Sequence, residues 1–337
     1  MTETRTALIL GATGGAGYEI AKALRAHGWY IRAMHRRPDS VSAQIPEAHW
    51  IAGDAMKAED VLLAATHADL IVHAVNPPGY RNWRKLVLPM IDNTIAAARA
   101  LGARIVLPGT VYNYGPDAFP LLRETSPQNP KTRKGGIRVE MEARLRRAAD
   151  AGVRVLIVRA GDFFGPNTGN SWLAQGMIRP GRPLRAITHP GKPGAGHAWA
   201  YLPDFAETIA RLVDRSEELA TFERFHFNGH WFEDGREIAE RLRIVAGAPD
   251  APIKPFPWPL LHMLTPFVPL FREMAEMQYL WNVPVRLDNA KLVSQLGIEP
   301  HTPIDEALRA TLRGMKCLPE TSAQAVDWSL ADINLPR

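Results

Sequence analysis

The chain has 337 residues and a formal net charge of +5, with 46% hydrophobic and 22% charged residues. This profile is typical of a globular protein with one large domain and a smaller lobe, and it excludes disordered, fibrous and repeat proteins. The Lys and Arg residues are spread out, which argues against nucleic acid as a partner. A single cysteine, Cys317, excludes a disulfide framework and a CxxC metal site within the chain.

Three features favour a cytoplasmic protein without a membrane span. The N-terminus runs from Met1 directly into a strand-like stretch, so we expect no signal peptide. One cysteine fits a reducing compartment. The most apolar late segment, Pro257–Phe271, is broken by prolines and is too short to cross a bilayer.

From residue 5 to residue 160, short apolar runs alternate with helical patterns. The predicted strands are Ala7–Leu10, Tyr30–His35, His49–Ala52, Leu70–Val75, Arg104–Leu107 and Val153–Arg159. The predicted helices are Ala16–Ala26, Glu59–Ala65, Leu86–Leu101, Gly136–Asp150 and Asp204–Arg215. This alternation predicts an α/β fold, a Rossmann-type doubly wound parallel sheet with a smaller C-terminal substrate lobe.

In the helix expected over Gly136–Asp150, two glutamates each precede an arginine by four residues. The spacing predicts the ion pairs Glu140–Arg144 and Glu142–Arg146 on the outer face of the helix.

After residue 159 the composition changes, because Pro-Gly pairs become frequent and strict alternation stops. We expect residues 1–160, with about 201–224, to form the Rossmann-type domain. Residues 161–200 and 225–320 are expected to form the smaller substrate-binding lobe, and residues 321–337 a tail. Within the lobe, Pro257–Phe271 either covers the pocket as an amphipathic lid or supports a homodimer.

A glycine-rich turn joins the first predicted strand to the first predicted helix. Gly11, Gly14 and Gly17 have GxxGxxG spacing, which permits a sharp turn and a close approach of the backbone to a pyrophosphate. The start of the helix adds free N–H groups and a positive dipole end. We therefore predict a dinucleotide site, the alternative being a tight turn without a ligand. The residues assigned to this part of the site are Gly11, Thr13, Gly14, Gly15, Ala16 and Gly17.

Arg36 and Arg37 follow the second predicted strand, where an NAD-specific site usually places Asp or Glu. Arginine offers a fork of donors to a 2′-phosphate, so NADP is the expected cofactor and NAD the alternative. Both arginines could also be solvated surface residues. Asp54, followed by Ala55, comes after the third predicted strand and either contacts the adenine amino group or forms a turn.

Several further segments resemble the extended and atypical short-chain dehydrogenases/reductases, often called the NAD-dependent epimerase/dehydratase family. The resemblance runs from Ala7 to about Leu312. Besides the glycine turn, the segments that carry it are Gly53-Asp54, His73-Ala74-Val75-Asn76, Pro108–Gly115, Arg159–Pro166, Tyr201–Ala206 and Asp288–Lys291 with Leu296-Gly297. It implies that Ala74 and Val75 pass the nicotinamide ribose, and that Thr110 supplies a catalytic hydroxyl.

One departure from the family pattern concerns its working pair, a tyrosine and a lysine four residues apart. Alignment on Glu142 puts Lys134 at the tyrosine position and Arg138 at the lysine position. The resemblance therefore implies that the usual acid/base is absent. Arg138 could hold a ribose or phosphate oxygen, but its pKa is too high for proton transfer.

Two residues could replace the missing proton donor. Tyr112 would share a face with Thr110 in extended geometry and is our substitute donor. Lys134 could act as an acid or a cation if it is buried beside Arg138. The alternatives are a strand-end cap for Thr110, a pocket wall for Tyr112 and a solvated loop lysine for Lys134.

Other polar and aromatic residues near the expected pocket have mainly structural readings. His73, Asp162 and His197 could titrate there, although satisfied structural groups are commoner. Four tryptophans favour an apolar substrate wall: Trp172, Trp199, Trp258 and Trp281. The expected function is that of an NADP-dependent oxidoreductase or epimerase acting on a small organic substrate. The alternative is a non-catalytic NADP-binding sensor.

Overall fold

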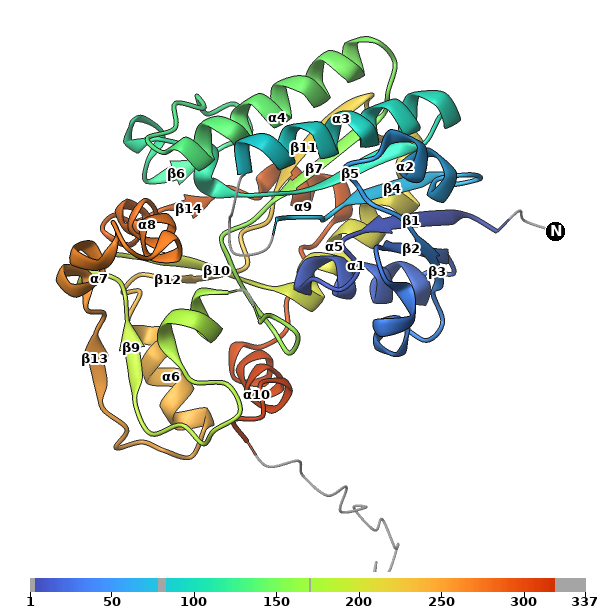
Figure 1. Ribbon diagram of the computed structural model, residues 1–337. Helices are drawn as coiled ribbons and strands as arrows, with labels where there is room; N and C mark the ends of the chain where they lie inside the picture. Colours follow the sequence, from blue (N-terminus) through green and yellow to red (C-terminus); the bar gives the residue numbers. More distant parts are fainter. Residues whose placement is uncertain (1–3, 78–82, 170, 319–337) are drawn as a thin grey trace, which may run out of the picture.

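The computed structural model describes residues 4–77, 83–169 and 171–318. Its centre is a seven-stranded sheet in the order β11-β7-β5-β4-β1-β2-β3, in which neighbouring strands are parallel (Figure 1). The strands are β1 Thr6–Leu10, β2 Tyr30–His35, β3 His49–Ala52, β4 Leu70–His73, β5 Arg104–Gly109, β7 Val155–Arg159 and β11 Phe222–His226. The predicted α/β, Rossmann-type doubly wound sheet is confirmed.

Helices cover both faces of this sheet. On one face lie α2 (Ala58–Ala64), α3 (Trp83–Leu101) and α4 (Arg133–Asp150); on the other lie α1 (Gly15–Ala26) and α5 (Leu202–Asp214) (Figure 1). Because side chains alternate along a strand, β1 supplies both cores: Leu8 packs with the first group of helices and Ile9 with the second.

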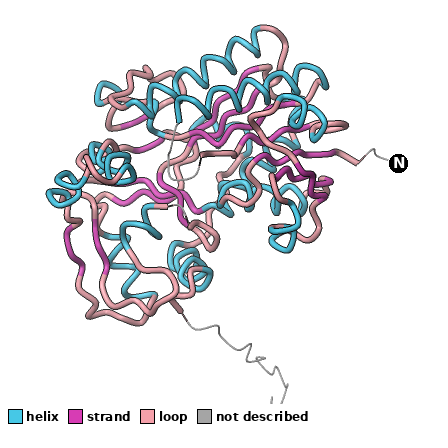
Figure 2. Tube along the Cα trace, in the orientation of Figure 1, coloured by secondary structure: helices cyan, strands magenta, loops and turns pink. Residues whose placement is uncertain are grey.

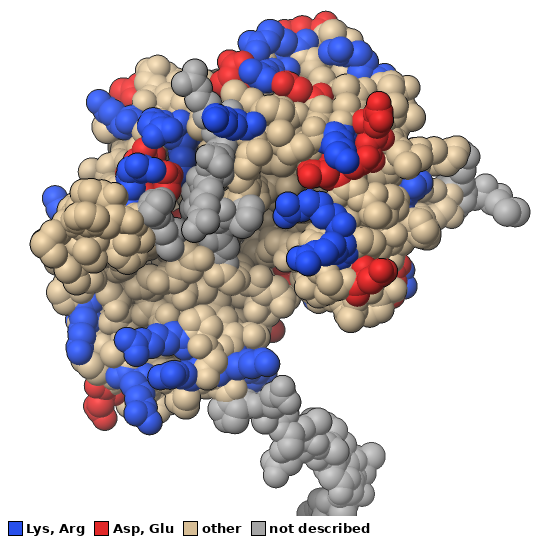
Figure 3. Space-filling model, in the orientation of Figure 1, with Lys and Arg blue, Asp and Glu red and all other residues tan. Residues whose placement is uncertain are grey.

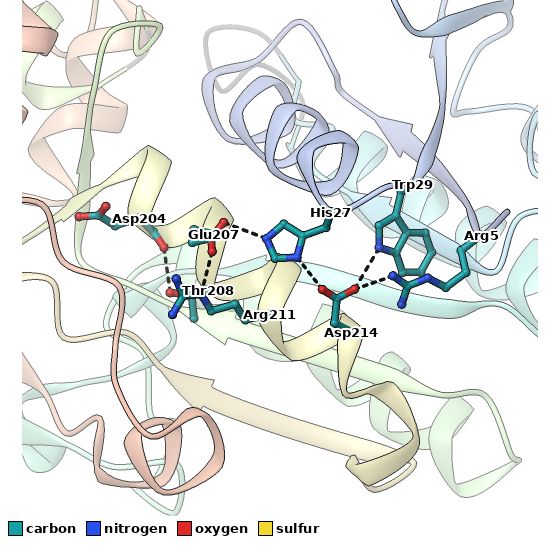
Figure 4. Close-up of polar contacts among 8 residues, drawn as sticks. All are labelled: Arg5, His27, Trp29, Asp204, Glu207, Thr208, Arg211 and Asp214. Atoms are coloured by element: carbon teal, nitrogen blue, oxygen red, sulfur yellow. Dashed lines mark hydrogen bonds and ion pairs between the residues drawn. The ribbon is translucent and has the colours of Figure 1, made fainter. Parts of the chain in front are cut away.

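A cluster of partly buried polar side chains holds α1 against α5 (Figure 4). His27, at the end of α1, lies 3.1 Å from Glu207 Oε2 and 2.5 Å from Asp214 Oδ2. Asp214 also accepts hydrogen bonds from Arg5 at 2.7 Å and Trp29 at 3.4 Å. Burial alone would lower the pKa of His27, but its bonds to the two carboxylates outweigh burial and raise that pKa above 6.5.

The rest of the described chain is built from small sheets and short helices, with long loops between them (Figure 2). A three-stranded sheet contains β8 Asp162–Phe164, β10 His197–Tyr201 and β12 His230–Phe232. Two-stranded sheets pair β9 Ile187–His189 with β13 Ile253–Pro255, and β6 Leu121–Leu122 with β14 Arg286–Leu287. The helices here are the π-helical turn η6 Leu173–Met177, α6 Glu237–Val245, α7 Trp258–Leu264, α8 Pro269–Ala275, α9 Ala290–Leu296 and α10 Ile304–Gly314. Short 3₁₀ turns occur at Pro38–Ser40, Ser42–Gln44, Val111–Asn113 (η4), Pro116–Ala118, Ser216–Glu218 and Gln278–Trp281. The expected tail, 321–337, lies outside the described residues.

Two sequence-based expectations for α4 need correction. The helix begins at Arg133 rather than Gly136, because the Thr132 hydroxyl accepts a hydrogen bond from the Gly135 N–H at 3.0 Å and caps it earlier. The pair Glu140–Arg144 forms as predicted, at 2.9 Å. Glu142 does not pair with Arg146, because it lies on the buried side of the helix and pairs there with Arg159 at 2.8 Å.

Strand boundaries and one strand also differ from the expectation. Strand β4 ends at His73 rather than Val75, and β11 had not been predicted. In β11, Phe222, Glu223 and Arg224 are half-buried and only Phe225 and His226 are buried, as befits an edge strand. The resulting mixed composition lacks a strand-like apolar run. Among the described residues, no helix has both the length and the apolar composition that crossing a bilayer requires.

Candidate active site

A cavity of about 630 Å³ lies along the carboxyl ends of the central strands. It brings together residues from segments far apart in the sequence. The predicted site residues that line it are Gly11, Thr13, Gly14, Gly15, Ala16, Arg36, Asp54, Ala55, Ala74, Val75, Thr110, Tyr112, Lys134 and Arg138. Gly17 and Arg37 lie outside its lining.

The glycine turn packs so closely that side chains do not fit. Gly11 has φ +91°, and a Cβ there would lie 2.7 Å from the backbone of Ala74 and Val75. A Cβ on Gly17 would lie 2.2 Å from the Gly11 carbonyl oxygen. Gly17 therefore acts through packing of α1 on the turn, while Gly11 keeps the turn against the end of β4.

Helix α1 presents an open N-terminus to the cavity. Its N-cap is Gly14, no side chain caps it, and no acidic residue stands in its first turn. The first N–H groups and the positive end of the helix dipole are therefore available to an anion. Together with the close backbone packing, this end of the cavity fits the pyrophosphate of a dinucleotide.

The two arginines after β2 differ in position. Arg36 is exposed and lines the cavity, whereas Arg37 is exposed outside it. Asp54 forms the turn that was one of its two expected roles, since its Oδ1 accepts a hydrogen bond from the Met56 N–H at 3.0 Å. Its residue also lines the cavity.

Arg138 and His73 lie where the cavity passes the end of β4. Arg138 is buried, donates to Asn76 Oδ1 at 3.2 Å, and stacks over the Trp83 ring at 5.1 Å. Thr94 gives its hydroxyl proton to the Met90 carbonyl, so His73 Nδ1, 2.8 Å away, donates to Thr94. Burial, with the charge of Arg138, lowers the pKa of His73 to about 3, so the ring is neutral.

Thr110 and Tyr112 both line the cavity, but not in the extended geometry that we expected. Residues 111–113 form the 3₁₀ turn η4, which begins directly after Thr110. The Thr110 side-chain oxygen is buried and has no hydrogen-bond partner among the described residues. Its carbonyl oxygen accepts a hydrogen bond from Arg159. Thr110 is therefore held by its backbone, while its hydroxyl remains available to a ligand.

Lys134 lies in the first turn of α4 and is 3% exposed, so the alternative of a solvated loop lysine is wrong. Its Nζ donates to the Glu273 carbonyl at 2.5 Å and lies 3.4 Å from Glu273 Oε2. Burial lowers the pKa of Lys134, and the nearby carboxylates of Glu273 and Glu276 offset only part of that effect. Arg138 follows one helical turn later on the same buried side.

Asp162, at the start of β8, also lines the cavity. His197 Nε2 lies 2.8 Å from its Oδ2, and the His197 ring stacks on Trp281 with centroids 3.9 Å apart and planes 6° apart. Among the four expected tryptophans, Trp172 lines the cavity. Trp199, Trp258 and Trp281 contribute to the core behind it. No metal-binding group of His, Cys, Asp or Glu side chains occurs within the described ranges.

The segment expected as a lid or dimer support forms α7 and the start of α8. Glu273 and Met274 of α8 line the cavity. On the outside, Leu260, Met263 and Phe267 are 51%, 65% and 80% exposed. In Figure 3 the bulge over α7 and α8 is almost free of charged side chains, whereas Lys and Arg are mixed with Asp and Glu on the upper part of this face and predominate on the lower lobe.

Comparison with protein families identifies the relationship that this geometry suggests. A model of the NAD dependent epimerase/dehydratase family matches residues 7–228, about two thirds of the chain. The chain belongs to this family.

Similar proteins support the same assignment. A 3-diazoavenalumate denitrifying reductase from Streptomyces is 30% identical over 178 residues, which cover 48% of this chain and 57% of that reductase. The match thus spans less than two thirds of the relative's length.

Solved structures of epimerases share the fold. A UDP-glucuronic acid 4-epimerase from Bacillus cereus, in complex with UDP-glucuronic acid and NAD, matches with a TM-score of 0.70 and 14% identity over 92% of this chain and 99% of that chain. A nucleoside-diphosphate-sugar epimerase from Pseudomonas aeruginosa matches with a TM-score of 0.69 and 17% identity over 94% and 98% of the two chains.

Sequence reasoning missed three groups of cavity residues. Glu273 and Met274 come from a segment with no chemical motif, more than 130 positions beyond Lys134. Asn76 lies in one of the segments that resemble the family. Its hydrogen bond with Arg138 depends on where α4 packs, which the sequence pattern does not show. Helix α3 begins at Trp83, three residues before the predicted start at Leu86, so the sequence did not predict the contact between Trp83 and Arg138.

Proposed function

We propose that this chain is an NADP-dependent oxidoreductase that reduces a small organic carbonyl compound or a chemically related acceptor. The observation that carries the proposal is the buried Lys134, which lines the same cavity as Thr110, Tyr112 and the glycine turn. A lysine of lowered pKa inside a dinucleotide-type cavity suits proton transfer better than passive sensing. The reductase among the relatives favours reduction over epimerisation.

The residues around the cavity divide the work of holding the cofactor. The N-terminus of α1 and the glycine turn would bind the pyrophosphate, and Arg36 would bind the 2′-phosphate. Asp54 would face the adenine, and Arg138 would hold a ribose oxygen. We further propose that residues 1–160 with about 201–224 form the cofactor domain, and that 161–200 and 225–320 form the substrate lobe.

The bound dinucleotide would supply the hydride that reduces the substrate carbon. Thr110 would donate a hydrogen bond to the carbonyl oxygen and so stabilise the negative charge that develops there. Lys134 would deliver the proton to that oxygen, since the lowered pKa makes its ammonium a better acid than that of a solvated lysine. Tyr112 is the second candidate donor, and Glu273 positions Lys134 through the two contacts at its Nζ.

The cofactor assignment is tested with two neighbouring arginines. Arg36→Ala should weaken NADPH binding about tenfold or more and leave NADH within about threefold, because charge-assisted bonds to a phosphate contribute about 1.5–3 kcal/mol. Arg37→Ala is the matched control, since Arg37 is equally exposed and lies outside the cavity. Fluorescence titration measures both cofactors. Equal losses for NADPH and NADH in Arg36→Ala would refute the 2′-phosphate assignment.

The proton donor is tested by turnover with NADPH and a panel of carbonyl substrates. Lys134→Met should lower kcat about 100-fold or more, the usual contribution of a general acid, with NADPH affinity nearly unchanged. Tyr112→Phe should keep most of the activity. The opposite pattern would move the role to Tyr112. Binding of NADPH without turnover on any acceptor would favour the sensor alternative.

A further inference from the structure

One carboxylate in the cavity has no role in the proposed reaction. Asp162 follows β7 by three residues and opens β8, where it pairs in register with Trp199 of β10. Its side chain is 17% exposed, and the residue lines the cavity. Oδ2 accepts the hydrogen bond from His197, and Oδ1 has no partner among the described residues. One oxygen of this carboxylate is thus available to a ligand.

The surroundings of Asp162 are mostly apolar. Its neighbour Gly161 packs tightly on β10, since a Cβ there would lie 2.3 Å from the Ala198 carbonyl oxygen. Ala198 belongs to the same hydrophobic cluster as Met277, Trp172 and Tyr112, and the last three line the cavity. A carboxylate at the edge of such a wall attracts a cation more strongly than it would in water.

The cations that line the cavity are already engaged elsewhere. Lys134 is bound to Glu273, and Arg138 contacts Asn76 and Trp83 beyond the end of β4. Arg36 lies after β2, at the far side of the glycine turn. Among the described residues, the basic group in contact with Asp162 is His197, which is buried behind it against Trp281.

The Asp162 carboxylate disfavours a diphosphate in this part of the cavity. A diphosphate beside Asp162 would place like charges together, and among the described residues no arginine or lysine contacts Asp162 to offset that charge. Three of the similar structures contain UDP-sugars, and those ligands carry a diphosphate. The Asp162 carboxylate therefore favours a substrate that carries a positive rather than a negative group at this position.

We propose that Asp162 is a specificity residue that binds a positively charged group on a substrate with an apolar, aromatic-sized body. The body would lie against Trp172 and Met277, with the reacting atom near Thr110. His197 positions the carboxylate through Oδ2, so Oδ1 receives the cation. This inference rests on the proposed function, because it concerns the substrate of the same cavity.

Three probes of one shape and different charge test the proposal: benzamidine as the cation, benzamide as the neutral form and benzoate as the anion. Each is titrated into NADPH-saturated protein by calorimetry at one pH and one salt concentration. Wild-type protein should bind benzamidine at least about tenfold more tightly than benzamide, since a charge-assisted hydrogen bond to a carboxylate replaces a neutral one. Benzoate should bind most weakly.

Variants separate charge from shape. Asp162→Asn should remove the preference for benzamidine over benzamide, while Asp162→Glu should retain it. Trp172→Ala should weaken all three probes together. The matched control is Asp250→Asn, because Asp250 is exposed in a turn outside the cavity and should change nothing.

The outcomes distinguish this inference from the proposed function. If NADPH fails to bind the wild-type protein, the proposed function fails. If NADPH binds but benzoate or benzamide binds as tightly as benzamidine, only the inference about Asp162 fails. The order of affinities in the wild-type protein decides this even if Asp162→Asn does not fold. An unchanged preference in a folded Asp162→Asn variant would also overturn it.

Discussion

The ion pair between Glu142 and Arg159 should be among the most sensitive points of the fold. Arg159 Nη2 lies 2.8 Å from both carboxylate oxygens of Glu142, and the two side chains are 1% and 6% exposed. Glu142→Gln keeps the shape but leaves the Arg159 charge buried without its partner. Breaking a buried pair in this way costs about 3–5 kcal/mol of unfolding free energy.

Urea unfolding followed by circular dichroism measures this loss, and α4 offers a matched control. Glu140→Gln removes the same charge from the same helix, but Glu140 pairs with Arg144 at the surface and is 41% exposed. That variant should lose less than about 1 kcal/mol. The double variant Glu142→Leu/Arg159→Met should recover most of the stability lost by Glu142→Gln, because it removes both buried charges. Equal losses in Glu142→Gln and Glu140→Gln would refute this reasoning.

Further predictions concern the glycine turn, acid stability and the pH profile. Gly17→Ala should lower the free energy of unfolding by about 1–3 kcal/mol and weaken NADPH binding, because the new Cβ would lie 2.2 Å from the Gly11 carbonyl oxygen. Gly136→Ala is the control and should be neutral or slightly stabilising, because a Cβ at Gly136 would have no neighbouring atom within 4 Å. Burial lowers the pKa of His73 and of His226 to about 3 from 6.5. The unfolded chain therefore binds more protons between these values, and stability against urea should fall as pH drops from about 6.5 toward 3. His226→Gln should reduce the slope by about one proton, and an unchanged slope would contradict the assignment. The pKa of Lys134 lies below its ordinary 10.5, so the side chain loses its proton, and reductive turnover should decline, at a pH below 10.5. Lys134→Arg should shift the decline of any remaining activity to higher pH.

Most of the central sheet could be predicted because β1, β4, β5 and β7 are buried on both faces. Runs such as Ala7–Leu10 and Arg104–Leu107 are almost wholly apolar, and the first of them leads through the glycine turn into helix α1. Strand β11 escaped prediction because its sequence, Phe-Glu-Arg-Phe-His, has two adjacent charged residues in place of an apolar run.

The cavity could be predicted in the part that a continuous stretch of sequence forms. The glycine turn is contiguous in sequence and has a strict steric need, so residues from Gly11 to Ala16 were found together. Glu142 was misplaced because i,i+4 spacing with Arg146 looks favourable, although the buried partner Arg159 lies on another element. Glu273 was missed because its contact with Lys134 joins two segments that only the tertiary fold brings together.

In chain order, strand β11 of the central sheet follows β8 and β10, which belong to the three-stranded sheet. During synthesis, β7 therefore leaves the ribosome with β5 on one side and nothing on the other until Phe222–His226 follows. Unpaired strand edges recruit other chains, and incomplete intermediates are the species that aggregate. We therefore expect the free edge of β7 to be an aggregation risk while the more than sixty residues between these two strands are added.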